Sequence, residues 1–219
     1  MIVIINNSEN NIGWTKKIKN IMNSLCPESN SVIINGKDEM NNILKKVEHI
    51  HGIILSGSAT RIREKHCLNK ILHNVMPMVE LDVPILGICF GHQLISLTYQ
   101  SKICSFKEMV SGHKQIHFKS DPLFKGIDNP SYMYNAHYDY VEKVPVFFKC
   151  LAKDENDIIY AIKHKDKKIY GLQFHPEFSN YGNGLQIYKN FIKMCGYKYR
   201  DLNYGDIPDV KHKNSDKFL

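Results

Sequence analysis

Hydrophobic and polar positions alternate between two patterns over the first hundred residues. Short apolar runs rich in β-branched residues, typical of buried strands, are separated by longer stretches with apolar residues at helical spacing. The predicted strands are 1–6, 31–35, 51–57 and 83–89, and the predicted helices are 13–25, 38–50, 67–81 and 90–100. Pro77 is expected to kink or interrupt the third of these helices. Strands that alternate with helices predict a parallel sheet covered on both faces.

The pattern changes after Ser101. Short β-rich runs separated by polar turns predict an antiparallel or mixed layer. These runs are 102–106, 114–118, 132–138, 148–153, 157–164 and 167–174. A last helix is predicted over 184–196, with Gly196 suited to its C-cap. We therefore predict an α/β fold with an open, mainly parallel central sheet, helices on both faces and a smaller antiparallel or mixed layer.

The chain is expected to form one domain over residues 1–196, followed by a polar, aperiodic tail or surface extension over 197–219. A length of 219 residues, 43% hydrophobic and 23% charged, suits one globular domain. The net charge of +7 comes from lysines spread thinly along the chain. That spread favours a solvated surface, so no nucleic-acid partner is predicted.

Membrane, secretory and metal-binding classes are also disfavoured. No apolar run is long enough to cross a membrane, and the N-terminal residues do not have the pattern of a secretory leader. The cysteines contain no CxxC pair, which argues against a metal site or a disulfide framework and for a reducing, cytoplasmic compartment. They are Cys26, Cys67, Cys89, Cys104, Cys150 and Cys195. No cofactor is expected.

One cysteine stands in an unusual local pattern. Gly87-Ile88-Cys89-Phe90-Gly91 places Cys89 between two glycines, where a predicted strand meets a predicted helix. Such a turn projects its side chain above the sheet edge, and the glycines relieve crowding. The helix N-terminus favours the thiolate form, and the carboxyl ends of strands are where ligands bind in open α/β sheets. Cys89 is therefore predicted to be a nucleophile rather than a packed core cysteine.

A thiolate that transfers an acyl group needs a base, and the base needs an orienting partner. The stretch Tyr170–Asn180, YGLQFHPEFSN, offers both. His175 follows a predicted strand, and Glu177 lies two residues further on. Because residues i and i+2 of an extended segment face the same side, Glu177 is expected to hold one imidazole nitrogen while the other faces the sulfur.

Together, VPILGICFGHQLI and IYGLQFHPEFS resemble the class I glutamine amidotransferases, the triad-type glutaminases with a flavodoxin-like fold. The resemblance extends over nearly all of residues 1–196. Within the family, MIVIINN, GIILSGS, NAHYDYVEKVP and the last helix are most similar to the glutaminase subunits of GMP synthase. The family's S-H-x-D-x-V loop is matched here by Ala136, His137, Asp139 and Val141.

The resemblance implies a set of roles. Cys89 would attack the side-chain amide carbon of L-glutamine, His175 would carry protons, and Glu177 would hold the imidazole tautomer. Backbone N–H groups of Phe90 and of the Gly57-Ser58 loop would form the oxyanion hole. The implied contacts to bound glutamine are Gln93, Asn135, Ala136 and His137.

Two short stretches depart from the family pattern. The family usually has S-G-G-P in the oxyanion loop, and this chain has Ser56-Gly57-Ser58-Ala59. A side chain at Ser58 restricts the backbone if that peptide must flip or hold a positive φ. Family members also commonly have a Gly-Gly pair after the nucleophile helix, where this chain has Gln100-Ser101. The triad motifs are intact, so a working enzyme with an altered basal rate is expected.

The ammonia acceptor is left open by the sequence. The chain shows no P-loop and no ATP-pyrophosphatase loop, so a separate synthase subunit of the ATP-pyrophosphatase type is the expected partner, most naturally for amination of XMP to GMP. A stand-alone γ-glutamyl peptidase or hydrolase with the same triad is one alternative. A non-catalytic regulatory protein that keeps the fold is another, and Ser58 is its only support.

Overall fold

The computed structural model of the chain describes residues 1–8, 12–38, 49–62 and 68–208. These residues form a nine-stranded sheet with strand order β2-β1-β3-β4-β9-β8-β7-β5-β6. Five strands pair in parallel: β1 (Ile2–Asn6), β2 (Val32–Asn35), β3 (Gly52–Leu55), β4 (Ile85–Ile88) and β9 (Ile169–Leu172). The other four pair antiparallel: β5 (Ile103–Phe118), β6 (Ser131–Val141), β7 (Phe148–Lys153) and β8 (Ile159–His164).

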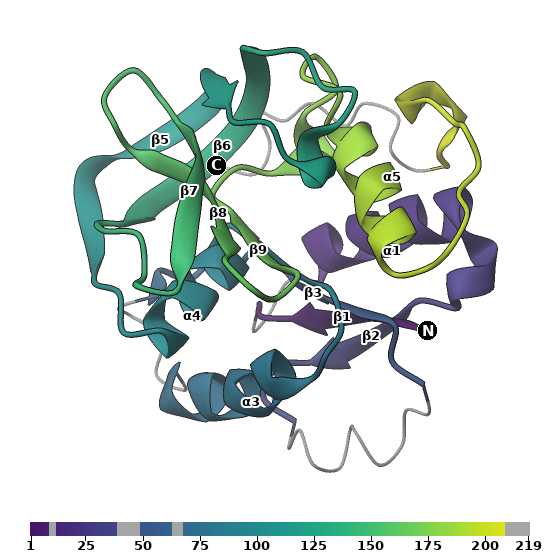
Figure 1. Cartoon of the computed structure of the whole chain (residues 1–219), viewed down its shortest axis with the longest axis horizontal. Helices are drawn as coiled ribbons and strands as arrows, with labels where there is room; N and C mark the ends of the chain where they lie inside the picture. The colour runs from purple at the N-terminus through teal and green to yellow at the C-terminus, as the bar shows by residue number, and fades with distance from the viewer. Residues whose placement is uncertain (9–11, 39–48, 63–67, 209–219) are drawn as a thin grey trace.

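Helices cover both faces of the parallel strands (Figure 1). On one side lie α1 (Gly13–Leu25) and α5 (Gly184–Met194), and on the other lie α3 (Leu68–Glu80) and α4 (Phe90–Thr98). The side chains of β1 alternate between the two faces, as a buried parallel strand requires. Ile2 and Ile4 belong to the hydrophobic cluster with α1 and α5, and Val3 and Ile5 to the cluster with α3 and α4. The predicted fold class is confirmed.

The antiparallel part continues the same sheet from the parallel strand β9, and one of its strands is longer than the sequence pattern suggested. The runs predicted as separate strands at 102–106 and 114–118 belong to one strand, β5, of 16 residues. Its pairing with β6 shifts between Ser105 and Val110, which makes a bulge. A bulge leaves residues unpaired and breaks the alternation of side chains, so a pattern search takes the strand for two.

Two predicted helices also differ from expectation. Helix α3 continues through Pro77 to Glu80, so the predicted interruption does not occur. Pro77 lies in the last turn, where its missing N–H leaves only the carbonyl of His73 without its helical donor. The helix predicted over 38–50 lies mostly outside the described residues, and its last two positions, His49 and Ile50, are not helical.

Helices α4 and α5 end in the same backbone motif. In α5 the N–H of Gly196 bonds to Lys193 O and the next N–H bonds to Ile192 O. Gly196 has φ +83°, as the predicted C-cap requires. In α4 the corresponding N–H groups of Gln100 and Ser101 bond one turn back. Gln100 occupies the glycine position with φ +61°, a conformation that strains any residue with a Cβ.

Gln100→Gly is expected to stabilise the chain by about 0.5 to 1 kcal/mol, because relief of left-handed strain exceeds the added entropy of glycine in the unfolded chain. Gln100 is exposed, so no packing is lost. Urea unfolding measures the change. Gly196→Ala is the matched control and is expected to destabilise by a similar amount, since a Cβ there has open space but a positive φ. A lower unfolding midpoint for Gln100→Gly would contradict the interpretation.

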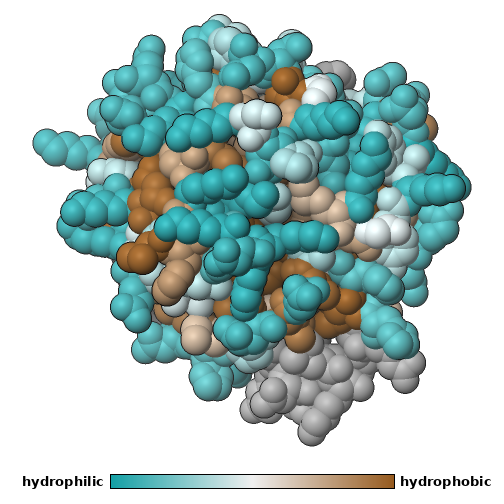
Figure 2. Space-filling model, viewed as in Figure 1, coloured by the Kyte–Doolittle hydropathy of each residue, from teal (hydrophilic) through white to brown (hydrophobic). Residues whose placement is uncertain are grey.

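Hydrophilic side chains cover most of the molecular face shown in Figure 2, and the apolar side chains on that face form separate patches. Among the described helices, none is both long and apolar enough to cross a membrane. No group of three or more His, Cys, Asp or Glu side chains in the described ranges is placed to hold a metal ion.

Candidate active site

The turn between β4 and α4 is built by close backbone packing. Cys89 lies at this turn with φ +49°, an unusual conformation for a residue with a side chain. A Cβ added to Gly87 would lie 2.6 Å from Gly91 O, and one added to Gly91 would lie 2.3 Å from Leu55 O. Both glycines are therefore needed for α4 to turn back so tightly over β3 and β4. The strain at Cys89 is of the kind that collects at functional sites.

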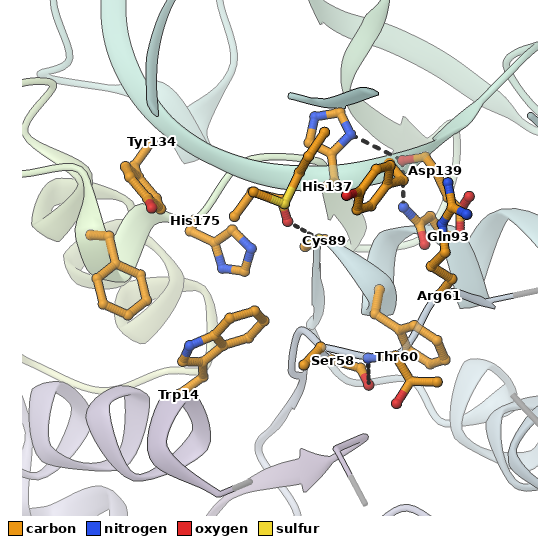
Figure 3. Close-up of a pocket in the computed structure, with 16 residues that line it drawn as sticks. Trp14, Ser58, Thr60, Arg61, Cys89, Gln93, Tyr134, His137, Asp139 and His175 are labelled. Carbon is orange, nitrogen blue, oxygen red and sulfur yellow. Dashed lines mark hydrogen bonds between the residues drawn. The ribbon is translucent and has the colours of Figure 1, made fainter. Parts of the chain in front are cut away.

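The sulfur of Cys89 lies among polar groups of β6 and of Gln173, the residue after β9. Cys89 is 4% exposed, and its Sγ lies 4.0 Å from the carbonyl oxygen of Ala136 (Figure 3). The side-chain amide of Gln173 donates to the sulfur at 3.6 Å. The amide of Gln93 in turn donates to Gln173 Oε1 at 3.3 Å and to the carbonyl of Asp139 at 2.8 Å. The side-chain amides of Gln93 and Gln173 thus form a hydrogen-bonded chain that ends at the Cys89 sulfur.

His175 and Glu177 form a buried pair. His175 Nδ1 lies 2.8 Å from Glu177 Oε1, and the two side chains are 1% and 0% exposed. The connecting segment is a short 3-10 helix, η4 (Pro176–Phe178), not the extended segment that the sequence suggested. The imidazole lies beside Cys89 in Figure 3, and its Nε2 has no hydrogen-bond partner among the described residues. The structure thus brings Cys89, His175 and Glu177 together.

Electrostatics distinguish His175 from the neighbouring histidines. Burial disfavours its charged form, but the Glu177 carboxylate and the sulfur of Cys89 raise the pKa of His175 from 6.5 to about 10. Burial and the neighbouring His175 lower the pKa of His137 to about 4. Burial and His137 lower the pKa of His92 to about 3. At neutral pH, His175 is therefore the protonated member of the three.

The imidazole of His175 is held between an aromatic ring and a glycine. The ring of Trp14, at the start of α1, meets it edge-on with centroids 4.9 Å apart. A Cβ added to Gly57 would lie 2.9 Å from His175 Cε1 and 3.1 Å from Trp14 Cε3. Gly57 was predicted only as part of an oxyanion loop, and the structure adds that a larger residue there would displace the imidazole.

A cavity of about 130 Å³ opens above Cys89, between α1, the loop after β3, the bulge of β5, and β6 (Figure 3). Most predicted site residues line it: Ser58, Cys89, Phe90, Gln93, Ala136, His137 and His175. Asn135 does not. Its side chain is fully buried and donates to Met133 O at 2.9 Å.

The loop after β3 has one hydrogen bond within it and one that joins it to β6. Thr60 N donates to Ser58 Oγ at 3.3 Å, and Ile62 N donates to Asp139 Oδ2 at 3.0 Å. Asp139 Oδ1 accepts from Ser105 Oγ, which ties the loop to β5 and β6. The φ angle at Ser58 is not positive. In this conformation Ser58 fits the loop without backbone strain, and its hydroxyl stabilises it.

Sequence reasoning did not identify four residues around the site. Gln173 lies two residues before His175, which is the one local signal that could have indicated it. Trp14 packs on the imidazole, and Tyr188 of α5 donates to Glu177 Oε2 at 3.2 Å. Arg61 places its guanidinium 4.1 Å above the ring of Tyr138 at the cavity. The last three lie outside the two motifs, on α1, on α5 and in the loop after β3.

The fold and this geometry define a class. A family model described as "Glutamine amidotransferase class-I" matches residues 13–195. The chain belongs to the class-I glutamine amidotransferase family.

Within that family, three similar proteins are each described as a subunit of GMP synthase. The chain is 37% identical over 202 residues to that subunit from Methanosphaera stadtmanae, covering 89% of this chain and 97% of that protein. It is 34% identical over 202 residues to the subunit from Methanococcus maripaludis, covering 92% and 100%. The crystal structure of a putative GMP synthase subunit from Thermoplasma acidophilum superimposes with a TM-score of 0.75 at 26% identity, covering 89% and 93%.

Proposed function

We propose that this chain hydrolyses L-glutamine to glutamate and ammonia through a cysteine thioester. The observation that carries the proposal is the placement of Cys89, on its strained turn, beside the imidazole of the buried His175–Glu177 pair. Membership of the class-I glutamine amidotransferase family supports the same reaction. The relatives' name, which includes the words glutamine-hydrolyzing, describes the same reaction.

The proposed reaction assigns each triad member a task. The Cys89 thiolate attacks the side-chain amide carbon of glutamine, and the carbonyl becomes a tetrahedral oxyanion. His175 gives its proton to the amide nitrogen, the C–N bond breaks, and ammonia departs. A γ-glutamyl thioester then remains on Cys89. His175 then takes a proton from water, which attacks the thioester and releases glutamate and the thiolate. Glu177 bonds to His175 Nδ1 and keeps Nε2 directed at the reacting atoms.

The surroundings of the sulfur are assigned to transition-state and substrate binding. The backbone N–H of Phe90 and that of the Gly57-Ser58 loop are proposed as donors to the oxyanion. Gln93, Ala136 and His137 line the cavity and are proposed to contact the glutamine. Asn135 was predicted with them; its fully buried side chain donates to Met133 O, and we propose that it supports the strand that carries Ala136 and His137.

The ammonia is proposed to pass to a separate synthase subunit of the ATP-pyrophosphatase type, for amination of XMP to GMP. The relatives named as one subunit of GMP synthase support this assignment. A cytoplasmic location belongs to the same proposal, and the free thiols of the five described cysteines fit a reducing compartment. We also propose one domain over residues 1–196 with an extension over 197–219.

The test combines this chain with a purified archaeal-type GMP synthase subunit of the ATP-pyrophosphatase type. Glutamine, XMP and ATP are expected to give equal amounts of glutamate and GMP, and Cys89→Ser is expected to remove both products. Ammonium salts should restore GMP, but not glutamate, with the Cys89→Ser chain. Cleavage of a γ-glutamyl peptide by the chain alone, without stimulation by the synthase, would instead favour the peptidase. If the chain hydrolyses neither glutamine nor the γ-glutamyl peptide, the result would favour the non-catalytic regulatory protein.

Ser58→Gly is expected to raise the basal glutaminase rate of the isolated chain and to reduce its stimulation by the synthase. The substitution removes the hydroxyl that accepts from Thr60 N, and it frees the peptide to turn its N–H toward the oxyanion. A single oxyanion donor is worth about a hundredfold in rate, which sets the upper limit of the gain.

Ser58→Ala separates the effect of the lost hydroxyl from the effect of a freer backbone, because it removes the hydroxyl and keeps the Cβ. We expect Ser58→Ala to raise the basal rate less than Ser58→Gly does. Steady-state glutamate release is measured for all three chains with and without the synthase. A wild-type chain that alone already reaches the stimulated rate would show that the loop is preformed.

A further inference from the structure

The C-terminal extension is folded against the rest of the protein as far as the structure describes it, over residues 197–208, called here the C-terminal segment (Figure 1, yellow). Arg200 N donates to Leu25 O at 2.7 Å at the end of α1. Asp201 accepts from Lys189 Nζ of α5 at 2.6 Å. Ile207 is fully buried in the cluster shared with α1 and α5. The segment lies beyond the residues matched by the family model.

A hydrogen bond joins the segment to the catalytic turn. The hydroxyl of Tyr204 donates to the carbonyl oxygen of Pro176, the residue between His175 and Glu177. Tyr204 begins a 3-10 turn, η5 (Tyr204–Asp206), that a capping box closes: Asn203 N donates to Asp206 Oδ2 at 2.8 Å. The hydroxyl is therefore presented by a fixed turn rather than by a free chain end.

The carbonyl that Tyr204 holds is closely confined. Pro176 O also accepts from Ser179 N at 3.1 Å, which closes the η4 turn. A Cβ added to Gly184 would lie 2.3 Å from the same oxygen, so α5 packs directly on it. The peptide from Pro176 to Glu177 is thus fixed on three sides, and its orientation sets where the Glu177 carboxylate points.

Two tyrosines bear on the position of Glu177. Tyr188 donates directly to Glu177 Oε2 at 3.2 Å, and Tyr204 acts through the Pro176 carbonyl. Burial and the charge of Glu177 hold the pKa of both phenols well above their ordinary value of 10.0. Both therefore remain hydroxyl donors throughout the range in which His175 titrates.

We propose that Tyr204 is a positioning residue for the catalytic pair, and that the C-terminal segment is a working part of the glutaminase rather than a passive tail. Tyr204 holds the Pro176 carbonyl so that Glu177 Oε1 stays within 2.8 Å of His175 Nδ1. The inference rests on the proposed function, since it assigns the segment a task in that same site. Without the hydroxyl, the turn stays packed but the carboxylate is held less firmly.

Tyr204→Phe removes the hydroxyl and keeps the ring. We expect kcat to fall about fivefold to tenfold, the effect of one lost hydrogen bond, with the KM for glutamine unchanged. Tyr197→Phe is the matched control, because it removes a hydroxyl of the same segment that bonds to His51 Nδ1 instead. The control is expected to keep the wild-type kcat. Asp206→Ala keeps Tyr204 but removes the capping carboxylate, and is expected to lower kcat about twofold to fivefold.

A second readout does not depend on glutamine hydrolysis. In Tyr204→Phe, nitrogen-15 NMR of the His175 ring is expected to show a lower titration midpoint than in wild type and in Tyr197→Phe, because Glu177 stabilises the imidazolium less. Identical midpoints and identical kcat in the two variants would overturn the positioning role. A shifted midpoint in Tyr204→Phe, together with a wild-type chain that never hydrolyses glutamine, would support the positioning role and refute the proposed function.

Discussion

Cys89→Ser is expected to reduce glutamine hydrolysis by a factor on the order of 10⁴ or more, because loss of a triad nucleophile removes the covalent route altogether. A thiol can ionise near neutral pH and a serine hydroxyl does not, so the variant lacks an anionic nucleophile. The variant is expected to fold, since serine is smaller and meets the same φ of +49°. Glutamate release and thermal unfolding measure the two effects separately.

The same residue is expected to be the one that a glutamine-analogue chloroketone labels. Burial raises the pKa of Cys26, Cys150 and Cys195, the last to about 12, which keeps these three thiols protonated and unreactive. Stoichiometric label on Cys89 by mass spectrometry is the expected result. Cys150→Ser is the control, and it should leave both labelling and hydrolysis at the wild-type level. Label found mainly on another cysteine would sink the assignment.

His175→Ala is expected to cost about a thousandfold or more in kcat, and Glu177→Gln considerably less. Removal of the imidazole leaves no group to carry the proton between the thiol, the ammonia and the water. Glu177→Gln keeps one side-chain oxygen that can accept from His175 Nδ1, but it replaces the oxygen that faces the Tyr188 hydroxyl with an NH2 group and removes the charge. Single-turnover and steady-state rates distinguish the two variants. Equal, small losses would show that the pair is structural.

The charge of Glu177 also predicts a pH dependence of stability. The folded chain raises the pKa of His175 from 6.5 to about 10, so proton binding favours the folded state. This contribution is fully present below pH 6.5 and is lost as the pH rises through about 10. The stability difference between wild type and Glu177→Gln is therefore expected to be largest at the acidic end of this window and to shrink toward its alkaline end. Urea unfolding across the window measures it.

The central part of the site could be read from the sequence because its constraints are local. Cys89 and its two glycines lie within five consecutive residues, and only a tight turn explains glycine at both positions. His175 and Glu177 are two residues apart, so they meet whether the backbone between them is extended or, as found, a 3-10 turn. The strand and helix pattern was equally local. The bulge in β5 was missed because it breaks the alternation on which that reading depends.

The chain's own pattern therefore determined the alternating elements, the nucleophile turn and the base with its carboxylate. Tertiary structure decided how these parts come together. Strand β4 pairs with β9, the last strand in the sequence. This pairing brings the ends of both strands, with Cys89 and His175, to one edge of the sheet. The contacts of Trp14 and Tyr204 with the His-Pro-Glu turn arise in the same way. Backbone geometry fixes neighbours a few residues apart, whereas distant partners are fixed only by strand pairing and by the packing of whole elements.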